Sequence, residues 1–202
     1  MSKKIITISR EYGSGGDIIG KLLANHLGLP YYDNELLLLA HKRSDIRLST
    51  IKEYDEKRGN RYLFYEVNHE GNSTVKKGES MEDTIYAIQK DAILSLAEKG
   101  NGAVIIGRCA DAILKEAGYE PLTIFISAPV EFRTHRISIV EGIDEAAARK
   151  RVKHMDKSRQ QFYESRSDQL WGHPATYDLC YNSAKYSNFD DIAELIAEYY
   201  TE

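Results

Sequence analysis

A glycine-rich stretch near the start of the chain limits what this chain can fold into. It reads SREYGSGGDIIGK, over residues 9–21, and it directly follows the apolar run IITI at residues 5–8. Apolar residues continue behind it at helical spacing as far as residue 27. This order predicts a strand, a tight glycine turn and a helix. The amides of such a turn and the amino end of the helix together favour a bound anion.

The same alternation of apolar runs and helical segments continues along the chain. The runs alternate little between apolar and polar residues, which is typical of strands buried on both faces of a parallel sheet. They lie at residues 4–9, 30–33, 103–107, 122–127 and 177–182. Helical spacing of apolar residues predicts helices over 17–27, 81–99 and 189–200. The chain is therefore predicted to be α/β, a three-layer α/β/α fold with a central parallel sheet of about five strands.

Two segments interrupt this alternation. Residues 44–80 are long and polar and contain no strong strand pattern, whereas residues 141–174 are densely charged, helical and end at WGHP. Both are predicted to be lobes inserted at the carboxyl ends of strands, where open α/β sheets bind ligands. We therefore expect a single domain over 1–202 with two lobes, of which 141–174 is a helical lid.

Composition argues against several classes of protein. A formal net charge of −4 lacks the basic excess of a general nucleic-acid binder. No apolar run approaches the roughly 18–20 residues that cross a bilayer. The two cysteines, Cys109 and Cys180, lie far apart without zinc-site spacing and suggest a reducing compartment. We expect a cytoplasmic protein that binds neither nucleic acid nor membrane, and the sequence leaves its oligomeric state open.

The side chains of the glycine stretch depart from the common nucleotide-binding patterns. A dinucleotide fingerprint would place a glycine three residues after Gly15, where this chain has Ile18. In the pattern G-x-x-x-x-G-K-[ST], aligning Gly15 with the second glycine puts Arg10 at the first glycine, Gly16 at the lysine and Asp17 at the hydroxyl residue. The plain alternative is a turn that needs glycine only for its geometry. Its direct connection to the first strand favours a phosphate or anion site.

Four longer stretches carry a resemblance to a known family. They read ISREYGSGGDIIGKLLANHLGLPYYDNELL, VIIGRCADAIL, LTIFISAPVEFRTHRI and MDKSRQQFYESRSDQLWGHPATYDLCYNS. In this order they resemble the cytidylate kinase-like family of the P-loop nucleoside monophosphate kinase superfamily. The resemblance implies a P-loop kinase-like fold and phosphoryl transfer from ATP, with Mg²⁺, to a nucleoside monophosphate. It does not include residues 44–80, which would form the lobe on the acceptor side.

The resemblance assigns the nucleotide to the glycine loop. The residues expected to contact it are Gly13, Ser14, Gly15, Gly16, Asp17 and Ile18. Asp17 is also the candidate Mg²⁺ ligand, since Mg²⁺ accepts carboxylate oxygen; its plain alternative is a carboxylate that stabilises a helix N-terminus. Two acidic positions of the family's Asp-Gly-Arg-Asp turn are Ile106 and Cys109 here. Only Gly107 and Arg108 of that turn remain.

Three arginines are the candidate catalytic cations. Arg10 enters the glycine loop, and Arg108 follows a buried strand at its carboxyl end, the edge at which such sheets bind ligands. Arg159 lies three residues after Asp156, matching an Asp-x-x-Arg pair that contacts the substrate nucleotide in cytidylate kinases. Asp33, Asp156 and Arg159 are therefore the expected substrate-binding residues. The plain alternatives are a surface ion pair for Arg10, an intrahelical salt bridge between Asp156 and Arg159, and a helix cap for Asp33.

Two functions remain open on this evidence. One is a phosphotransferase that moves the γ-phosphoryl group of ATP to a nucleoside monophosphate or a related small acceptor. The other is a non-catalytic nucleotide- or anion-binding protein that keeps the cradle but lacks the lysine and the metal-binding carboxylates. A kinase must turn over MgATP, whereas a binding module binds a nucleotide without transfer.

Overall fold

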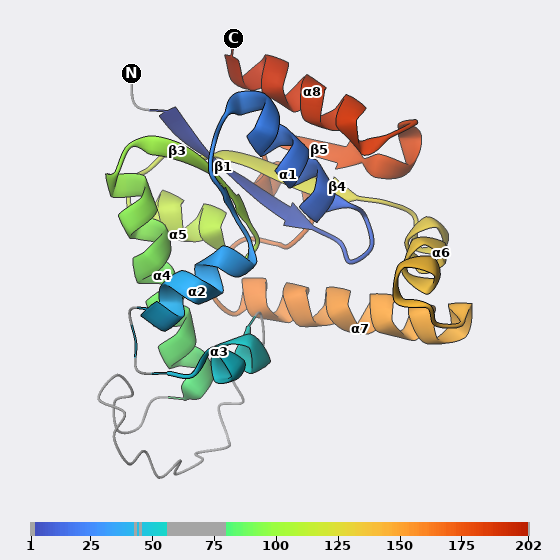
Figure 1. Ribbon diagram of the computed structural model, residues 1–202, viewed down its shortest axis with the longest axis horizontal. Coiled ribbons are helices and arrows are strands. Elements are labelled where there is room, and N and C mark those ends of the chain that lie inside the picture. The colour runs from blue at the N-terminus through green and yellow to red at the C-terminus, as the bar shows by residue number, and fades with distance from the viewer. Residues whose placement is uncertain (1–2, 43, 45, 56–79, 202) are drawn as a thin grey trace.

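The central feature of the molecule is a five-stranded sheet with helices on both faces (Figure 1). It is seen in a computed structural model that describes residues 3–42, 44, 46–55 and 80–201. All strand pairs are parallel, in the order β2-β3-β1-β4-β5. The strands are β1 (Lys3–Arg10), β2 (Tyr31–Tyr32), β3 (Asn101–Ile106), β4 (Leu122–Ser127) and β5 (Leu179–Asn182). The prediction of a three-layer α/β fold with a parallel sheet is confirmed.

The predicted helices are present with bounds shifted by a few residues at most. The helices are α1 (Gly16–Leu27), α2 (Asn34–Lys42), α3 (Leu48–Tyr54), α4 (Met81–Glu98), α5 (Ala110–Glu116), α6 (Val130–Glu141), α7 (Glu145–Glu164) and α8 (Phe189–Thr201). Two short 3₁₀ turns, η1 (Pro174–Thr176) and η2 (Ser183–Lys185), flank β5. The second strand is shorter than predicted, because only two residues of its weak apolar run pair with β3.

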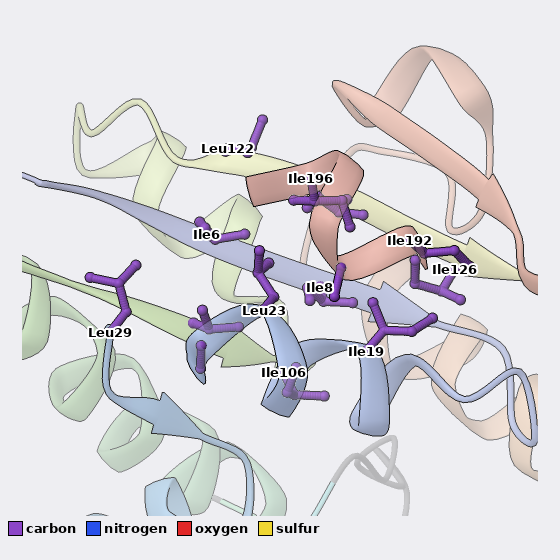
Figure 2. Close-up of a cluster of buried hydrophobic side chains, with 14 residues drawn as sticks. Ile6, Ile8, Ile19, Leu23, Leu29, Ile106, Leu122, Ile126, Ile192 and Ile196 are labelled. Atoms are coloured by element: carbon purple, nitrogen blue, oxygen red, sulfur yellow. The ribbon is translucent and has the colours of Figure 1, made fainter. Parts of the chain in front are cut away.

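One face of the sheet is covered by α1 and α8. Figure 2 shows Ile6 and Ile8 of β1 beside Ile19 of α1 and Ile192 of α8. All four side chains are fully buried, which explains why the runs that supply them are so strongly apolar. Gly20 of α1 lets the helix approach the sheet closely, since a Cβ there would lie 2.5 Å from a side-chain atom of Ile106. The helices α1 and α8, which are far apart in the sequence, are thereby packed together over the central strand.

The opposite face is covered by α4 and α5, together with the end of α7. Ile105 of β3 packs there with Ile93 of α4 and Ile113 of α5. Phe162 and Tyr163, near the carboxyl end of α7, join the same buried cluster. The end of α7 is therefore anchored in the core, while the rest of this helix passes across the carboxyl edge of the sheet (Figure 1).

The two predicted lobes differ in how much of them is described. In the lid segment, α7 packs against α6 through Ile137, Ala148 and Val152, with Tyr12 of the glycine loop beside them. Of the acceptor-side lobe 44–80, residues 44, 46–55 and 80 are described, and the rest lies outside the described residues. Its helix α3 packs through Ile51 into a separate cluster with α2 and α4. No helix within the described ranges combines the length and the apolar character needed to cross a bilayer.

Candidate functional site

The glycine loop joins the carboxyl end of β1 to the amino end of α1. Gly13 and Gly15 have positive φ angles of 83° and 84°, and Gly15 is the N-cap of α1. Ser14 is fully buried, and its hydroxyl donates to the Glu11 carbonyl at 2.8 Å. The Ser183 hydroxyl of η2 donates to the Ser14 carbonyl at 2.7 Å. The loop is therefore held in one shape by buried hydrogen bonds on its inner side.

Several backbone N–H groups of the loop lack an acceptor within the described part of the chain. Among the described residues, no hydrogen-bond acceptor contacts the N–H groups of Gly13, Gly15, Gly16 or Asp17. Successive N–H groups in a turn of this kind form a concave nest, to which the helix dipole adds positive potential. The loop therefore has the backbone geometry of an anion cradle.

Phe189 closes the loop from the side of α8. A Cβ atom on Gly15 would lie 2.4 Å from an atom of the Phe189 ring, so any side chain at this position would collide with the ring. The positive φ of Gly15 excludes other residues independently. The first residue of the last helix is therefore part of the structural support of the loop.

Arg10 and Gly16 occupy one small volume between the strand end and the helix start. A Cβ on Gly16 would lie 2.6 Å from the Cβ and 3.1 Å from the Cγ of Arg10. In the common lysine-containing pattern, the residue types at these two positions are the reverse, glycine at the strand end and lysine at the helix start. The structure therefore has room for a side chain at only one of these two positions, and in this chain that position is Arg10.

The three predicted catalytic arginines come together at the carboxyl edge of the sheet. They line a narrow pocket of about 10 Å³, roughly the room needed by one water molecule. Its lining residues are Ser9, Arg10, Gly107, Arg108, Cys109, Arg159, Phe162, Tyr163 and Trp171. Arg159 of α7 donates to the Arg10 carbonyl at 3.2 Å, and its guanidinium lies 5.4 Å from the centre of the Tyr12 ring. Arginines from two strand ends and from α7 therefore meet beside the glycine loop.

Arg108 is buried and held by two carboxylates. Its Nε and Nη2 donate to Asp55 at 3.1 and 2.7 Å, and its Nη1 contacts Asp33 and the Ile106 carbonyl. Both Arg108 and Cys109 have left-handed backbone φ angles, which turn the chain sharply between β3 and α5. The predicted substrate residue Asp33 therefore binds an arginine of the site. Asp55, just after α3, was not predicted, since nothing near it in sequence indicates that it reaches the sheet edge.

Asp156 does not form the intrahelical pair with Arg159 that was the plain alternative. Its Oδ1 accepts the Tyr12 amide N–H at 2.7 Å, and its Oδ2 accepts Arg133 Nη1 at 2.5 Å. Arg133, in α6, also lies 3.3 Å from a carboxylate oxygen of Glu11. Sequence reasoning did not single out Arg133. One sequence signal could have found Arg133. It lies in the first helical turn after the carboxyl end of β4, and that end of a parallel strand lies at the ligand-binding edge of the sheet.

Burial and neighbouring charges shift the ionisation of the loop residues. Burial raises the pKa of Glu11, and the nearby Asp156 carboxylate raises it further, while the Ala128 amide and Arg133 oppose the shift. Burial also raises the pKa of the Tyr12 phenol, whose hydroxyl donates to Glu141 at 2.5 Å. This bond ties the loop to the end of α6.

Asp17 lies in the first turn of α1 and is exposed. Its backbone carbonyl accepts the Tyr31 hydroxyl at 3.3 Å. The described residues offer no cluster of metal-ligating side chains that includes Asp17. A Mg²⁺ ion commonly binds one or two carboxylates and completes its shell with phosphate oxygens and water. A single exposed carboxylate beside the anion cradle fits that mode of binding.

A buried carboxyl group lies two residues after Cys109. Asp111 is 2% exposed and accepts the Tyr163 hydroxyl at 2.6 Å. Burial raises the pKa of Asp111 above its ordinary value, and the Tyr163 hydrogen bond lowers it in part. The chain thus has no carboxylate at Ile106 or Cys109, where the resemblance expects one. The carboxyl group that follows them, that of Asp111, is buried against Tyr163.

Solved structures of similar fold cover nearly the whole chain. The structure of an uncharacterized protein from Eubacterium ventriosum is 27% identical, with a TM-score of 0.72 and 99% of each chain covered. Shikimate kinase from Bacteroides thetaiotaomicron is 14% identical, with a TM-score of 0.58 over 98% of this chain and 99% of that one. A tunicamycin resistance protein from Deinococcus radiodurans is 14% identical, with a TM-score of 0.54 over 98% and 95%. At these low identities, the last two show the P-loop kinase fold alone.

Sequence comparison identifies the family. No curated protein is significantly similar to the chain. The model of the cytidylate kinase-like family, in contrast, matches residues 5–185. This range starts in β1 and ends in η2, so it contains the glycine loop, the three arginines and α7. The chain therefore belongs to the cytidylate kinase-like family.

Proposed function

We propose that the protein is a P-loop kinase-like phosphotransferase that moves the γ-phosphoryl group of ATP to a nucleoside monophosphate or a related small acceptor. Membership of the cytidylate kinase-like family supports this reaction class. The loop geometry supports it independently, since phosphoryl transfer relies on positioning and charge neutralisation more than on covalent chemistry by the protein.

The observation that carries the proposal is the steric exchange between Arg10 and Gly16. A chain that had merely lost its loop lysine would leave the cation position empty. Here the missing side chain at Gly16 coincides with a long cation at Arg10, whose Cβ would lie 2.6 Å from a Cβ at residue 16. We infer that Arg10 takes over the charge-neutralising role of the lysine, from the opposite side of the loop.

The remaining roles follow from position. The N–H groups from Gly13 to Asp17 would bind phosphate oxygens, and Asp17 would hold Mg²⁺ together with those oxygens. ATP, when bound, supplies the phosphoryl group. Arg159 reaches the same pocket from the lid helix, so its charge would be presented only when α7 lies across the site. Asp33 and Arg108 lie toward α2 and α3, on the acceptor side, where they would orient the second substrate.

A non-catalytic binding protein is the second candidate, and one observation favours it. Arg108 is paired with Asp33 and Asp55, and Arg133 with Glu11 and Asp156. Two of the cations near the cradle are thus already neutralised by carboxylates of the chain. A protein that binds nucleotide but transfers nothing would show saturable ATP binding and no loss of ATP with any acceptor.

Calorimetric titration with ATP, with and without Mg²⁺, tests the proposal first. Arg10→Gln is expected to weaken ATP binding at least tenfold, because it removes the charge and keeps most of the packing volume. Arg149→Gln is the matched control. It removes an exposed arginine of α7 that pairs with Glu131 at 3.5 Å, and we expect less than a twofold effect. Absence of any wild-type binding at millimolar MgATP would refute the proposal.

Transfer is then tested by phosphorus NMR with MgATP and each nucleoside monophosphate in turn. ADP formation that requires one acceptor supports the kinase. ATP binding without ADP formation for any nucleoside monophosphate or small hydroxylated acceptor favours the second candidate.

A further inference from the structure

A carboxylate of the lid helix lies on the rim of the glycine loop. Asp156 Oδ1 lies 2.7 Å from the Tyr12 amide nitrogen, and Oδ2 lies 2.5 Å from Arg133 Nη1. Residues 12 and 156 are far apart in sequence, so this contact depends on α7 crossing the carboxyl edge of the sheet. In the described part of the chain, the Tyr12 N–H is the one backbone donor between Tyr12 and Asp17 that binds an anionic side chain.

Arg133 is fixed beside this contact without help from Asp156. It is 5% exposed, its Nε donates to the Ala128 carbonyl at 2.8 Å, and its Nη1 donates to the Tyr12 carbonyl at 3.1 Å. These backbone acceptors belong to the end of β4 and to the loop itself. The guanidinium would therefore stay beside the loop if Asp156 moved away.

Two carboxylates, those of Glu11 and Asp156, place negative charge around the Arg133 guanidinium at this rim. Glu11 and Asp156 both contact Arg133. The pKa of Glu11 is raised, mainly by burial and to a smaller extent by the Asp156 carboxylate. An approaching phosphate would meet this charge close to the N–H groups that are to bind it. A carboxylate oxygen and a phosphate oxygen accept the same kind of charge-assisted hydrogen bond. The two therefore compete for the Tyr12 N–H and for Arg133.

We propose that Asp156 is an internal competitor for a phosphate group of the nucleotide, an inference that rests on the proposed function. With Asp156 in place, the cradle rim is occupied and Arg133 is neutralised. When a phosphate oxygen replaces it, Asp156 and with it α7 must shift, and Arg133 becomes available to the ligand. Occupancy of the loop is thereby coupled to the position of the helix that also carries Arg159.

The competition predicts a gain in affinity on removing one charge. Apparent affinity is reduced by the fraction of molecules in which the site is closed, and a variant without the competitor regains that fraction. Asp156→Asn keeps the shape of the side chain and an acceptor for the Tyr12 N–H but removes the charge. We expect it to bind ATP and pyrophosphate at least fivefold more tightly than the wild type does.

The test is calorimetric titration of the full chain with ATP, pyrophosphate and adenosine at fixed Mg²⁺. Glu145→Gln is the matched control, because it removes the same charge from an exposed position of the same helix, where Glu145 lies 3.3 Å from His135. It should change affinity less than twofold. A gain with ATP and pyrophosphate but not with adenosine supports a phosphate contact. If Asp156→Asn does not fold, Asp156→Ala removes the same carboxylate and replaces it in the test.

The possible failures are distinguishable. Wild-type binding that Asp156→Asn leaves unchanged or weakens would overturn the competition and leave the proposed function standing. Equal gains in Asp156→Asn and Glu145→Gln would also overturn it, since they would reflect the general charge of the lid. Absence of binding by every variant would overturn the proposed function and the competition together.

Discussion

The exchange between Arg10 and Gly16 makes a quantitative prediction about stability. An alanine at position 16 would place its Cβ 2.6 Å from the Cβ of Arg10, about 1 Å inside the normal separation of two carbon atoms. Overpacking of this kind costs about 1–3 kcal/mol, and the higher helix propensity of alanine offsets up to about 1 kcal/mol of it. We expect Gly16→Ala to lower the free energy of unfolding by about 1–2 kcal/mol.

The identity of the colliding atom provides the matched control. Arg10→Ala keeps the Cβ, so Gly16→Ala should remain destabilising in that background. Arg10→Gly removes the Cβ, and there the cost of Gly16→Ala should disappear. The coupling free energy between Gly16→Ala and Arg10→Gly is therefore expected to be about 1–3 kcal/mol, in the range found for residues in direct contact.

Urea unfolding followed by far-ultraviolet circular dichroism measures all of these free energies on one scale. The double-mutant cycle comprises the wild type, Gly16→Ala, Arg10→Gly and the variant with both changes, and Arg10→Ala is measured with and without Gly16→Ala. All are unfolded at the same pH and salt, and their free energies are compared only if their m-values are similar. An equal cost of Gly16→Ala in all three backgrounds would refute the steric reading. The cost of a side chain at position 16 would then not come from contact with the Arg10 Cβ, and the argument that Arg10 replaces the loop lysine would fail.

Two further predictions concern buried charges near the pocket. Arg108→Ala leaves Asp33 and Asp55 facing each other without their cation, and it should cost about 3–5 kcal/mol in urea unfolding; a loss below about 1 kcal/mol would contradict the buried pairing. Because the pKa of Asp111 is raised above its ordinary 3.8, the folded state holds this proton more tightly than the unfolded state does. Its contribution is most favourable at low pH and is lost as the pH rises through the raised value. Asp111→Asn should remove this decline, and an unchanged pH profile of the unfolding free energy would contradict it.

The fold was predictable from the sequence because its signals are local. Each strand of the sheet centre is a short apolar run, and runs buried on both faces leave little ambiguity about a parallel sheet. The weakest run gave the least accurate result, since β2 pairs only through Tyr31 and Tyr32. The short helices α2 and α5 were not predicted separately, because neither is long enough to show a clear helical period.

The site was predictable only where a residue's place follows from a strand end. Arg10 and Arg108 each come at or just after the carboxyl end of a central strand, and carboxyl ends of parallel strands share one edge. Asp55 and Arg133 reach the same edge through the packing of α3 and α6, which no local pattern encodes. The partner of Asp156 could not be foreseen for the same reason, and helical spacing alone pointed to Arg159 instead.

The order of the strands has a consequence for synthesis on the ribosome. β1 is made first but is the centre of the sheet, and its neighbours β3 and β4 begin at Asn101 and Leu122. At about 5–20 residues per second, roughly 5–20 seconds pass before the first of these partners exists. During that interval β1 lacks both of its sheet neighbours, and an apolar strand with unpaired edges is prone to aggregate. The contacts of Ser183 and Phe189 with the glycine loop come later still. The anion cradle is therefore completed only after residues 183 and 189 have been synthesised, long after the glycine loop itself.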